Sequence, residues 1–311
     1  MYADIYGRME KKGWKMRKTS ISRRVYLTFN MIVIALITVS CMVPILNVLA
    51  TSFSSAAYIN AGEVGLVPKG FTLAAYQFVL KDSRFWRSVL VTVERIVIGI
   101  PLNIGLSILI AYPLSKSELV FRERKIYVTF FLITMIFSGG MVPTYLLVYN
   151  LKMIDTIWAL VLPGAVNVFN TIVLMNFFRN LPKAIEESAL VDGAGHLTIM
   201  MKIFLPLSKP SIATITLFSL INNWNAWFDG LLYNNFTEHY PLQTYLQTTI
   251  TSSTEVNKVV NNIEDMMLRQ SVTARNLTAA KIFIAIVPLM CAYPFLQKHF
   301  ATGLVMGSVK E

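Results

Sequence analysis

The sequence predicts an all-α integral membrane protein with six transmembrane helices in a single domain. Of its 311 residues, 55% are hydrophobic and only 14% are charged, and the mean hydropathy is +0.55, which is far more apolar than an average soluble domain. Residues 26–50 and 126–151 contain no charged side chain. Each stretch exceeds the roughly 20 residues that a helix needs to cross about 30 Å of hydrocarbon, so both are predicted to span a membrane.

Six apolar segments are candidate spans, at residues 26–50, 89–114, 126–150, 156–178, 210–232 and 281–300. The second contains Glu94 and Arg95, which are adjacent and expected to pair or to snorkel. The sixth is flanked by Lys281 and Lys298, which are expected to anchor it at the membrane surface. The first span is longer than the roughly 7–15 apolar residues of a signal peptide, so we expect a retained helix. No repeat of 20–50 residues divides the chain.

Prolines lie in or at the ends of these spans, at Pro44, Pro101, Pro113, Pro143, Pro163, Pro288 and Pro294. Proline removes a backbone donor, and a helix bundle tolerates this where neighbouring groups or cavity water satisfy the freed carbonyl. The spans are therefore expected to be kinked or interrupted, unless a span simply ends at its proline.

Lys and Arg residues gather in one alternate set of connecting segments, namely the tail 1–25, the loops 115–125 and 179–209, and the tail 301–311. Cytoplasmic segments of membrane proteins carry an excess of these residues, so both termini are predicted to be cytoplasmic. The membrane domain at 26–300 then has a long cytoplasmic loop at 181–210 and a long external loop at 233–280.

The long cytoplasmic loop has the pattern of two short helices joined by a turn. Pro182 is suited to a helix start, and Glu186 and Glu187 lie in the first turn, where the helix dipole favours carboxylates. Gly193 and Gly195 end that helix before the next one begins. Such an element is rigid enough to transmit a push to the attached spans.

Motif spacing in this loop resembles that of a known family. Glu187-Ser188-Ala189 is followed by Gly193 after three residues, by Ile203 after nine more, and then by Leu205-Pro206. This resembles the EAA loop of binding-protein-dependent ABC importer permeases, although Ser188 replaces the commoner alanine. In that family the loop forms the coupling helix, which docks in a cleft of the ATP-hydrolysing subunit. The resemblance implies a coupling role for Glu186, Glu187, Ser188, Ala189, Asp192, Gly193, Ala194, Ile203, Leu205 and Pro206.

The resemblance extends over nearly the whole chain. Residues 138–145, 224–228 and 293–298 look like the carbohydrate-uptake branch of these permeases, closest to its subgroup for oligosaccharides such as aldouronates and pectin fragments. The smaller maltose permease subunit is similar in architecture. The resemblance implies a type I importer transmembrane domain that translocates a sugar, in particular an oligosaccharide, delivered by an extracytoplasmic solute-binding protein.

The same resemblance implies a set of partners in the bacterial cytoplasmic membrane. These are a second homologous permease, two copies of an ABC ATPase, the solute-binding protein and membrane lipid. The chain has no G-x-x-x-x-G-K-[ST] phosphate loop, so hydrolysis must come from a partner. We therefore expect a non-catalytic subunit that binds no cofactor itself, with ATP and Mg on the ATPase. The polar external loop at 233–280 is expected to meet the solute-binding protein.

Amide and indole side chains within the spans form a candidate substrate pathway. Sugar hydroxyls need donors and acceptors, and the C–H face of a sugar ring packs on aromatic rings. The same side chains also suit an interfacial aromatic belt and interhelical hydrogen bonds, and both interpretations stay open. The candidates are Asn167, Asn170, Asn222, Asn223, Trp224, Asn225 and Trp227.

Other function classes are disfavoured by the distribution of charged and nucleophilic residues. The basic residues lie between apolar spans, which argues against nucleic acid binding. His196, His239 and His299 are scattered, so no metal site is expected. Ionisable residues avoid the span centres, which argues against a proton-coupled carrier and a membrane-embedded enzyme. A permease for a non-sugar solute shares the coupling loop and is the nearest alternative, and a secondary carrier is a more distant one.

Overall fold

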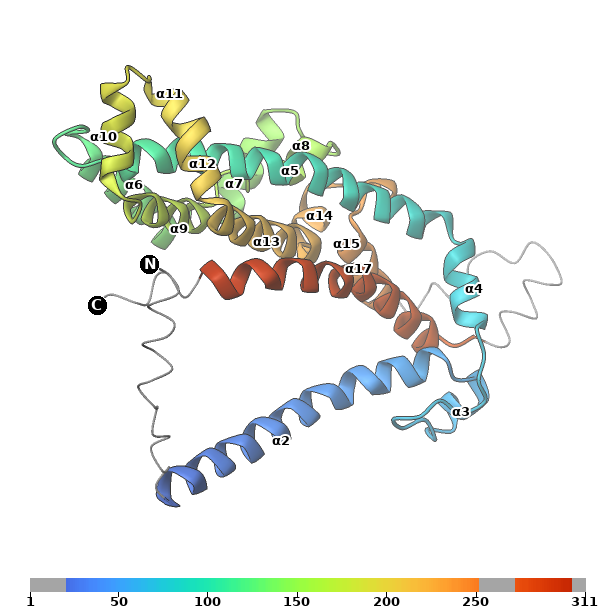
Figure 1. The fold of residues 1–311 in the computed structure, drawn as a ribbon. Coiled ribbons are helices and arrows are strands. Elements are labelled where there is room, and N and C mark those ends of the chain that lie inside the picture. The colour runs from blue at the N-terminus through green and yellow to red at the C-terminus, as the bar shows by residue number, and fades with distance from the viewer. Residues whose placement is uncertain (1–20, 252–271, 304–311) are drawn as a thin grey trace.

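The computed structural model describes residues 21–251 and 272–303, and its regular elements there are helices (Figure 1). This confirms the predicted all-α class. The two tails at 1–20 and 304–311 and part of the external loop, residues 252–271, lie outside the described residues. Helices α5, α9, α13 and α17 run alongside one another, whereas α2 diverges from them and meets α17 near one end only (Figure 1).

Three long helices correspond to the first, second and sixth predicted spans. They are α2 (Ile21–Ser52), α5 (Ser83–Ser115) and α17 (Ala274–Gly303). Each contains a stretch long and apolar enough to cross a membrane. Pro44 lies inside α2, and Pro101 and Pro113 lie inside α5, so these prolines do not interrupt their helices.

The third and fifth predicted spans are each part of a sharply bent helix pair. Helices α6 (Arg124–Ile136) and α7 (Met141–Asn150) meet at 107°. Gly140 in the connecting loop has φ +88°, a conformation that glycine adopts without steric cost. At the second bend, helix α13 (Lys209–Asn225) meets the preceding helical segment at 81°.

The fourth predicted span is divided in two. Helix α8 (Ile157–Val161) and helix α9 (Val168–Arg179) are separated by a loop containing Pro163 and Gly164. Helix α9 alone is about 18 Å long at 1.5 Å per residue, which is shorter than the hydrocarbon core. Within the described residues, three helices qualify as spans, or five if each bent pair is one span. The count of six therefore stays a prediction.

Shorter helices connect these elements. They are α3 (Ala56–Asn60), α4 (Ala74–Lys81), α10 (Lys183–Val191), α11 (His196–Ile199), the π-helical turn η1 (Met200–Phe204), α12 (Leu205–Leu207), α14 (Phe228–Tyr233), the 3₁₀ turn η2 (Thr237–His239) and α15 (Leu242–Thr251).

Two apolar clusters hold the bundle together near opposite ends of α5. One, called the upper cluster here, includes Phe85, Trp224 and Leu242 and joins α4, α5, α13, α15 and α17. The other, the lower cluster, includes Phe178 and Phe204 and packs the end of α5 against α9 and the loop that carries α10 and α11. Burial of these side chains supplies the packing that fixes how the helices cross.

A buried lysine lies at the upper cluster. Lys281 was expected to anchor α17 at the membrane surface, but its side chain is 2% exposed and its Nζ donates to Tyr245 Oη at 2.9 Å. Tyr245 Oη in turn donates to Asp82 Oδ2 at 2.8 Å. The polar chain offsets the cost of burying the lysine charge, and it ties α17 to α15 and to the start of α5.

Three buried polar side chains join α5, α9 and α13 at mid-bundle. Asn170 Nδ2 donates to Asn103 Oδ1 at 3.2 Å and to Ser219 Oγ at 3.1 Å, and Ser219 Oγ donates to Asn103 Oδ1 at 2.6 Å. All three are at most 4% exposed. This polar junction fixes the register of the three helices, since each bond would be lost if one helix slid.

Replacing Asn170 with alanine is expected to destabilise the protein by about 1–2 kcal/mol, because Asn103 and Ser219 lose a buried partner. Thermal unfolding of the purified protein in detergent measures the loss. Asn222→Ala, at an exposed position of α13, is the matched control and should change stability by less than about 0.5 kcal/mol. Equal effects of the two substitutions would contradict the assigned role of the junction.

Candidate coupling loop and substrate pathway

Helices α10 and α11 form a hairpin that projects from one end of the bundle (Figure 1). Its turn has the hydrogen bonds of a Schellman motif, in which Gly193 N donates to Leu190 O at 3.0 Å and Ala194 N donates to Ala189 O at 2.9 Å. Gly193 has φ +78°, which an L-residue with a side chain adopts only at a cost. The predicted pattern of helix, glycine turn and helix therefore matches the geometry.

A buried cation attaches this hairpin to the end of α5. Lys116 Nζ donates to Glu186 Oε1 at 2.5 Å and lies 3.9 Å from the ring centre of Tyr112 and 4.2 Å from that of Phe204. Burial lowers the pKa of Lys116, and its bond to Glu186 opposes that effect. The ion pair and two cation–π contacts bring together α5, α10 and η1.

The hairpin exposes apolar side chains. Val191 is 87% exposed and Leu197 is 72% exposed, and Leu190 and Met201 are also exposed. Large apolar residues gathered on one projecting element are typical of a surface that meets a protein partner.

The ten predicted coupling residues take different positions in this loop. Glu187, Ser188, Asp192, Gly193 and Pro206 are exposed, Ala189 is buried, and Glu186, Ala194, Ile203 and Leu205 are half-buried. The half-buried and buried apolar members pack on the lower cluster. The sequence motif thus contains one set that holds the hairpin to the bundle and another that faces outward. Its coupling role stays a prediction.

The candidate pathway residues also differ in their partners and in their exposure. Asn170 belongs to the buried polar junction, and Asn167 caps α9 by accepting from Asn170 N at 3.1 Å. Asn223 accepts from Arg95 Nε at 3.1 Å, and Trp224 is buried in the upper cluster. Asn222, Asn225 and Trp227 are exposed. These last three are the most exposed of the seven, whereas Asn167 and Asn223 are half-buried.

Arg95, in the second predicted span, forms an ion pair with a different residue from the one expected. Arg95 was expected to pair with its neighbour Glu94, but the Arg95 guanidinium pairs with Asp229 of α14 and with Asn223. Glu94 is exposed. Asp229 lies 134 positions along the chain from Arg95, and no local sequence pattern joins them. This contact holds the break between α13 and α14 against α5.

A polar clasp joins two loops near the start of η2. Asp155, with φ +61°, accepts from Asn235 N at 2.6 Å and from Asn235 Nδ2 at 2.8 Å, and it pairs with His239 at 3.7 Å. Desolvation raises the pKa of Asp155, but bonds from Asn235 and the Phe236 amide, with the charge of His239, outweigh it and lower the pKa below its ordinary value. No sequence pattern indicates this clasp, because isolated loop residues carry no periodic signal.

Known proteins resemble the chain over nearly its full length, although no family model matches it. The polygalacturonan/rhamnogalacturonan transport system permease protein YtcP of Bacillus subtilis is 39% identical over 270 residues, which cover 87% of this chain and 93% of that protein. A chain from the crystal structure of a bacterial ABC transporter involved in import of the acidic polysaccharide alginate is 32% identical, with a TM-score of 0.82. The match covers 90% of this chain and 98% of that one.

A second solved structure shows the fold alone. It is the bacterial alginate ABC transporter in complex with an alginate pentasaccharide-bound periplasmic protein, in which one chain is 18% identical with a TM-score of 0.51, covering 95% of this chain and 100% of that one.

These likenesses define the class of protein as the membrane component of an ABC importer. The chain belongs to the family of sugar ABC importer permeases, the carbohydrate-uptake branch. The resemblance noted in the sequence is thereby confirmed, and the chain is a plasma-membrane permease subunit.

Replacing Lys116 with methionine is expected to loosen the hairpin. The change removes the cation from Glu186, at a cost of about 1–2 kcal/mol because Glu186 is partly exposed to water. Amide hydrogen exchange of residues 183–191 should accelerate roughly tenfold, which corresponds to about 1.4 kcal/mol.

Lys125→Met is the matched control. Lys125 pairs with Glu118 at 3.3 Å, but both side chains are at least half exposed, and exposed pairs contribute little. Unchanged exchange at 183–191 in the Lys116 variant would contradict the attachment, whereas partial recovery in the reversed pair K116E/E186K would support it.

Proposed function

We propose that this chain is one of two permease subunits of a type I importer for an acidic oligosaccharide. The observation that carries the coupling part of the proposal is the projecting α10–α11 hairpin, with its exposed apolar residues and its fixed attachment to α5. An ATPase that docks on this hairpin moves the end of α5 directly, because the buried Lys116 contact leaves little play between them.

The proposed topology has six spans with both termini in the cytoplasm. Its supports are the three long helices, the two bent pairs, and the α8–α9 segment as the remaining crossing. The excess of Lys and Arg in the segments next to the hairpin and in the N-terminal tail places the hairpin in the cytoplasm. The α14–α15 segment and the clasp at Asp155 then face the outside.

Partner subunits complete the proposed importer. Two copies of an ABC ATPase supply ATP and Mg sites, and this chain binds no cofactor. A second homologous permease packs against α2, in which residues 25–49 are all exposed or half-buried. Lipid covers what that permease leaves exposed. An extracytoplasmic solute-binding protein delivers the substrate to the outer face, at the external loop.

The proposed substrate class rests on the relatives. The similar B. subtilis protein is named for polygalacturonan and rhamnogalacturonan, and the similar solved importer takes up alginate, described as an acidic polysaccharide. These polysaccharides all contain uronate units, which carry carboxylates. An oligosaccharide with uronate residues is therefore the substrate we propose.

Gly193→Val is expected to abolish ATP-driven uptake. A β-branched residue at φ +78° costs at least about 1–2 kcal/mol, so the hairpin turn distorts and the ATPase loses its docking surface. Co-purification of the ATPase with the permease pair measures docking. Gly193→Asn is the matched control, since asparagine tolerates this conformation and an added Cβ meets no atom within 4 Å. Wild-type coupling in the valine variant would refute the assignment.

The proposed function predicts ATPase activity that depends on a loaded binding protein. The chain is co-expressed with the neighbouring transporter genes and reconstituted in nanodiscs. Binding protein loaded with an oligogalacturonide or oligoalginate should stimulate hydrolysis several-fold, and neutral malto-oligosaccharides should not. Absence of any co-purifying ATPase would refute the coupling role, and stimulation by neutral sugars alone would refute the acidic class.

A further inference from the structure

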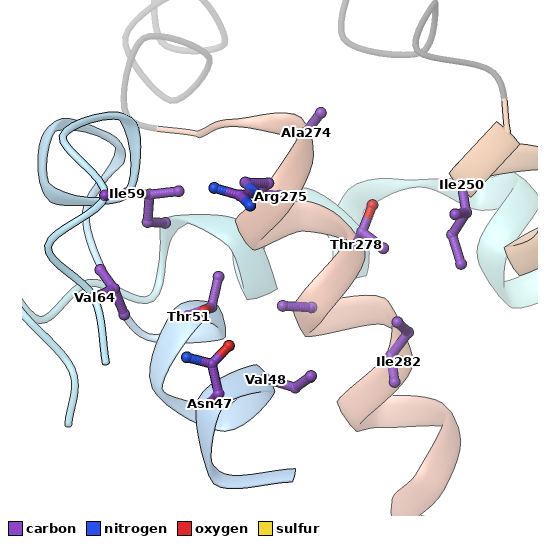
Figure 2. Close-up of a pocket in the computed structure, with 12 residues that line it drawn as sticks. Asn47, Val48, Thr51, Ile59, Val64, Ile250, Ala274, Arg275, Thr278 and Ile282 are labelled. Carbon is purple, nitrogen blue, oxygen red and sulfur yellow. The ribbon is translucent and has the colours of Figure 1, made fainter. Parts of the chain in front are cut away.

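A cavity of about 610 Å³ opens where α2, α3, α15 and α17 approach one another. This volume lies within the range of small-molecule sites. Figure 2 shows Asn47 and Thr51 of α2 on one side of it, Arg275 directed into the space near Ile59, and Thr278 of α17 on the side of Ile250. The four contributing elements come from distant parts of the sequence, so no local motif reports this cavity.

A second cavity of about 120 Å³ lies next to the first. Ile250 and Ile282 line both cavities. Beyond them, the second is lined by Trp227 and by residues that recur at helical spacing on α15 and α17, namely Gln243, Leu246, Gln247, Ala285 and Ile286. The two adjacent cavities are together called the α15–α17 groove here, with Arg275 at one end and Trp227 and Ile286 at the other.

The groove is longer than a single sugar ring. Eleven residues separate Arg275 from Ile286 on α17, which corresponds to about 16 Å at 1.5 Å per residue. Since Ala274 begins α17, the Arg275 end lies near the proposed outer face, and the Ile286 end lies about three turns along the helix. The groove therefore runs from the outer rim into the membrane domain.

The charge of the groove favours an anion. Arg275 is the charged side chain among the described residues that line the two cavities, and none of those lining residues is a carboxylate. A guanidinium forms two parallel hydrogen bonds with a carboxylate, which makes arginine well suited to a uronate. The groove thus has a fixed preference for negative charge at its outer end.

The remaining lining suits the rest of a sugar. Hydroxyl groups of Thr51 and Thr278 and the amide of Gln243 can donate to or accept from sugar hydroxyls. Trp227 is 39% exposed, so part of its indole is available to the C–H face of a sugar ring. Polar groups lie beside aliphatic ones along the groove, which matches the two faces of a carbohydrate.

We propose that the α15–α17 groove binds an acidic oligosaccharide on its way into the membrane domain, with Arg275 holding a uronate carboxylate and Trp227 stacking on a sugar ring. This inference rests on the proposed function and adds to it a substrate site on this subunit. Of the pathway residues suggested by the sequence, Trp227 lies on this route, whereas Asn167 and Asn170 serve the helix bundle.

The first test removes the cation. Arg275→Gln in the reconstituted importer should raise the half-saturating concentration of oligogalacturonide-loaded binding protein at least fivefold. Arg275→Lys should retain an intermediate value, because it keeps the charge and loses the paired hydrogen bonds. Lys152→Gln, which removes an exposed cation from another loop on the same face, is the matched control and should match wild type.

The second test adds a bulky side chain at Ile250, which lines both cavities. Ile250→Trp adds bulk at the residue shared by both cavities, and it should lower the uptake rate at least fivefold for every length of oligogalacturonide. Leu119→Trp, at a residue that is 98% exposed in the loop between α5 and α6, controls for the added indole. Reduced uptake in both tryptophan variants would indicate a general defect and overturn the assignment to the groove.

Three outcomes separate the site from the function. If the wild-type importer takes up no acidic oligosaccharide, the proposed function fails. If it does and Arg275→Gln behaves as wild type, the groove fails and the function stands. If Arg275→Gln instead releases the second permease during purification, the groove is a subunit interface and the substrate site is refuted.

Discussion

Backbone hydrogen bonding in hydrocarbon is the constraint on which this structure depends. A peptide group facing lipid must find its partner within the protein, and a helix supplies that partner within its own segment. The helix breaks at Gly139–Gly140, at Pro163–Gly164 and after Asn225 leave backbone groups that the adjacent protein or cavity water must satisfy. Irregular backbone at membrane depth is tolerated where it is buried in protein or lines a cavity. Gly139, Gly140, Pro163 and Gly164 are exposed on this subunit, so water or a neighbouring subunit must satisfy the groups freed there.

Helix α5 connects the two ends of the helix bundle. Toward its first half, Arg95 holds Asp229 and Asn223 beside the break between α13 and α14. Just beyond its last residue, Lys116 holds Glu186 of the hairpin. Between them, Asn103 fixes α5 to α9 and α13. In the proposed importer, a displacement of the hairpin would be carried along this helix to the segment proposed to face the outside. The contacts at both ends are ionic, and in each the cation is buried while its carboxylate is partly exposed to water.

The sequence predicted the parts of this arrangement that depend on local pattern. Charge-free stretches located the long helices, and the glycine at 193 located the hairpin turn, because both signals lie within a few consecutive residues. The sequence did not predict which spans are broken. In the sequence, Pro163 looks much like Pro44 and Pro101, which also lie in apolar stretches. Pro163 lies in a helix break, whereas Pro44 and Pro101 lie inside continuous helices. The effect of a proline depends on the groups that surround it.

Side-chain partners were the least predictable part. Arg95 lies beside Glu94 in the sequence, and Lys281 lies at the start of a predicted span. Both nevertheless bind side chains from other helices, Asn223 and Tyr245 respectively. The asparagines illustrate the same limit, because Asn170 and Asn222 have the same chemistry but one is buried and the other exposed. Their difference is a property of helix packing. Only the folded chain decides whether an amide serves as a structural bond or faces a solute.

The exposed apolar face of the hairpin also affects the abundance of this protein in the cell. A subunit without its ATPase offers Val191 and Leu197 to water, where such surface invites aggregation and capture by chaperones and proteases. If the proposed ATPase docks on this hairpin, subunits that find no ATPase would be removed, and the abundance of the permease would follow that of its partner. The same few side chains that receive a mechanical push would then also set the stoichiometry of the assembled complex.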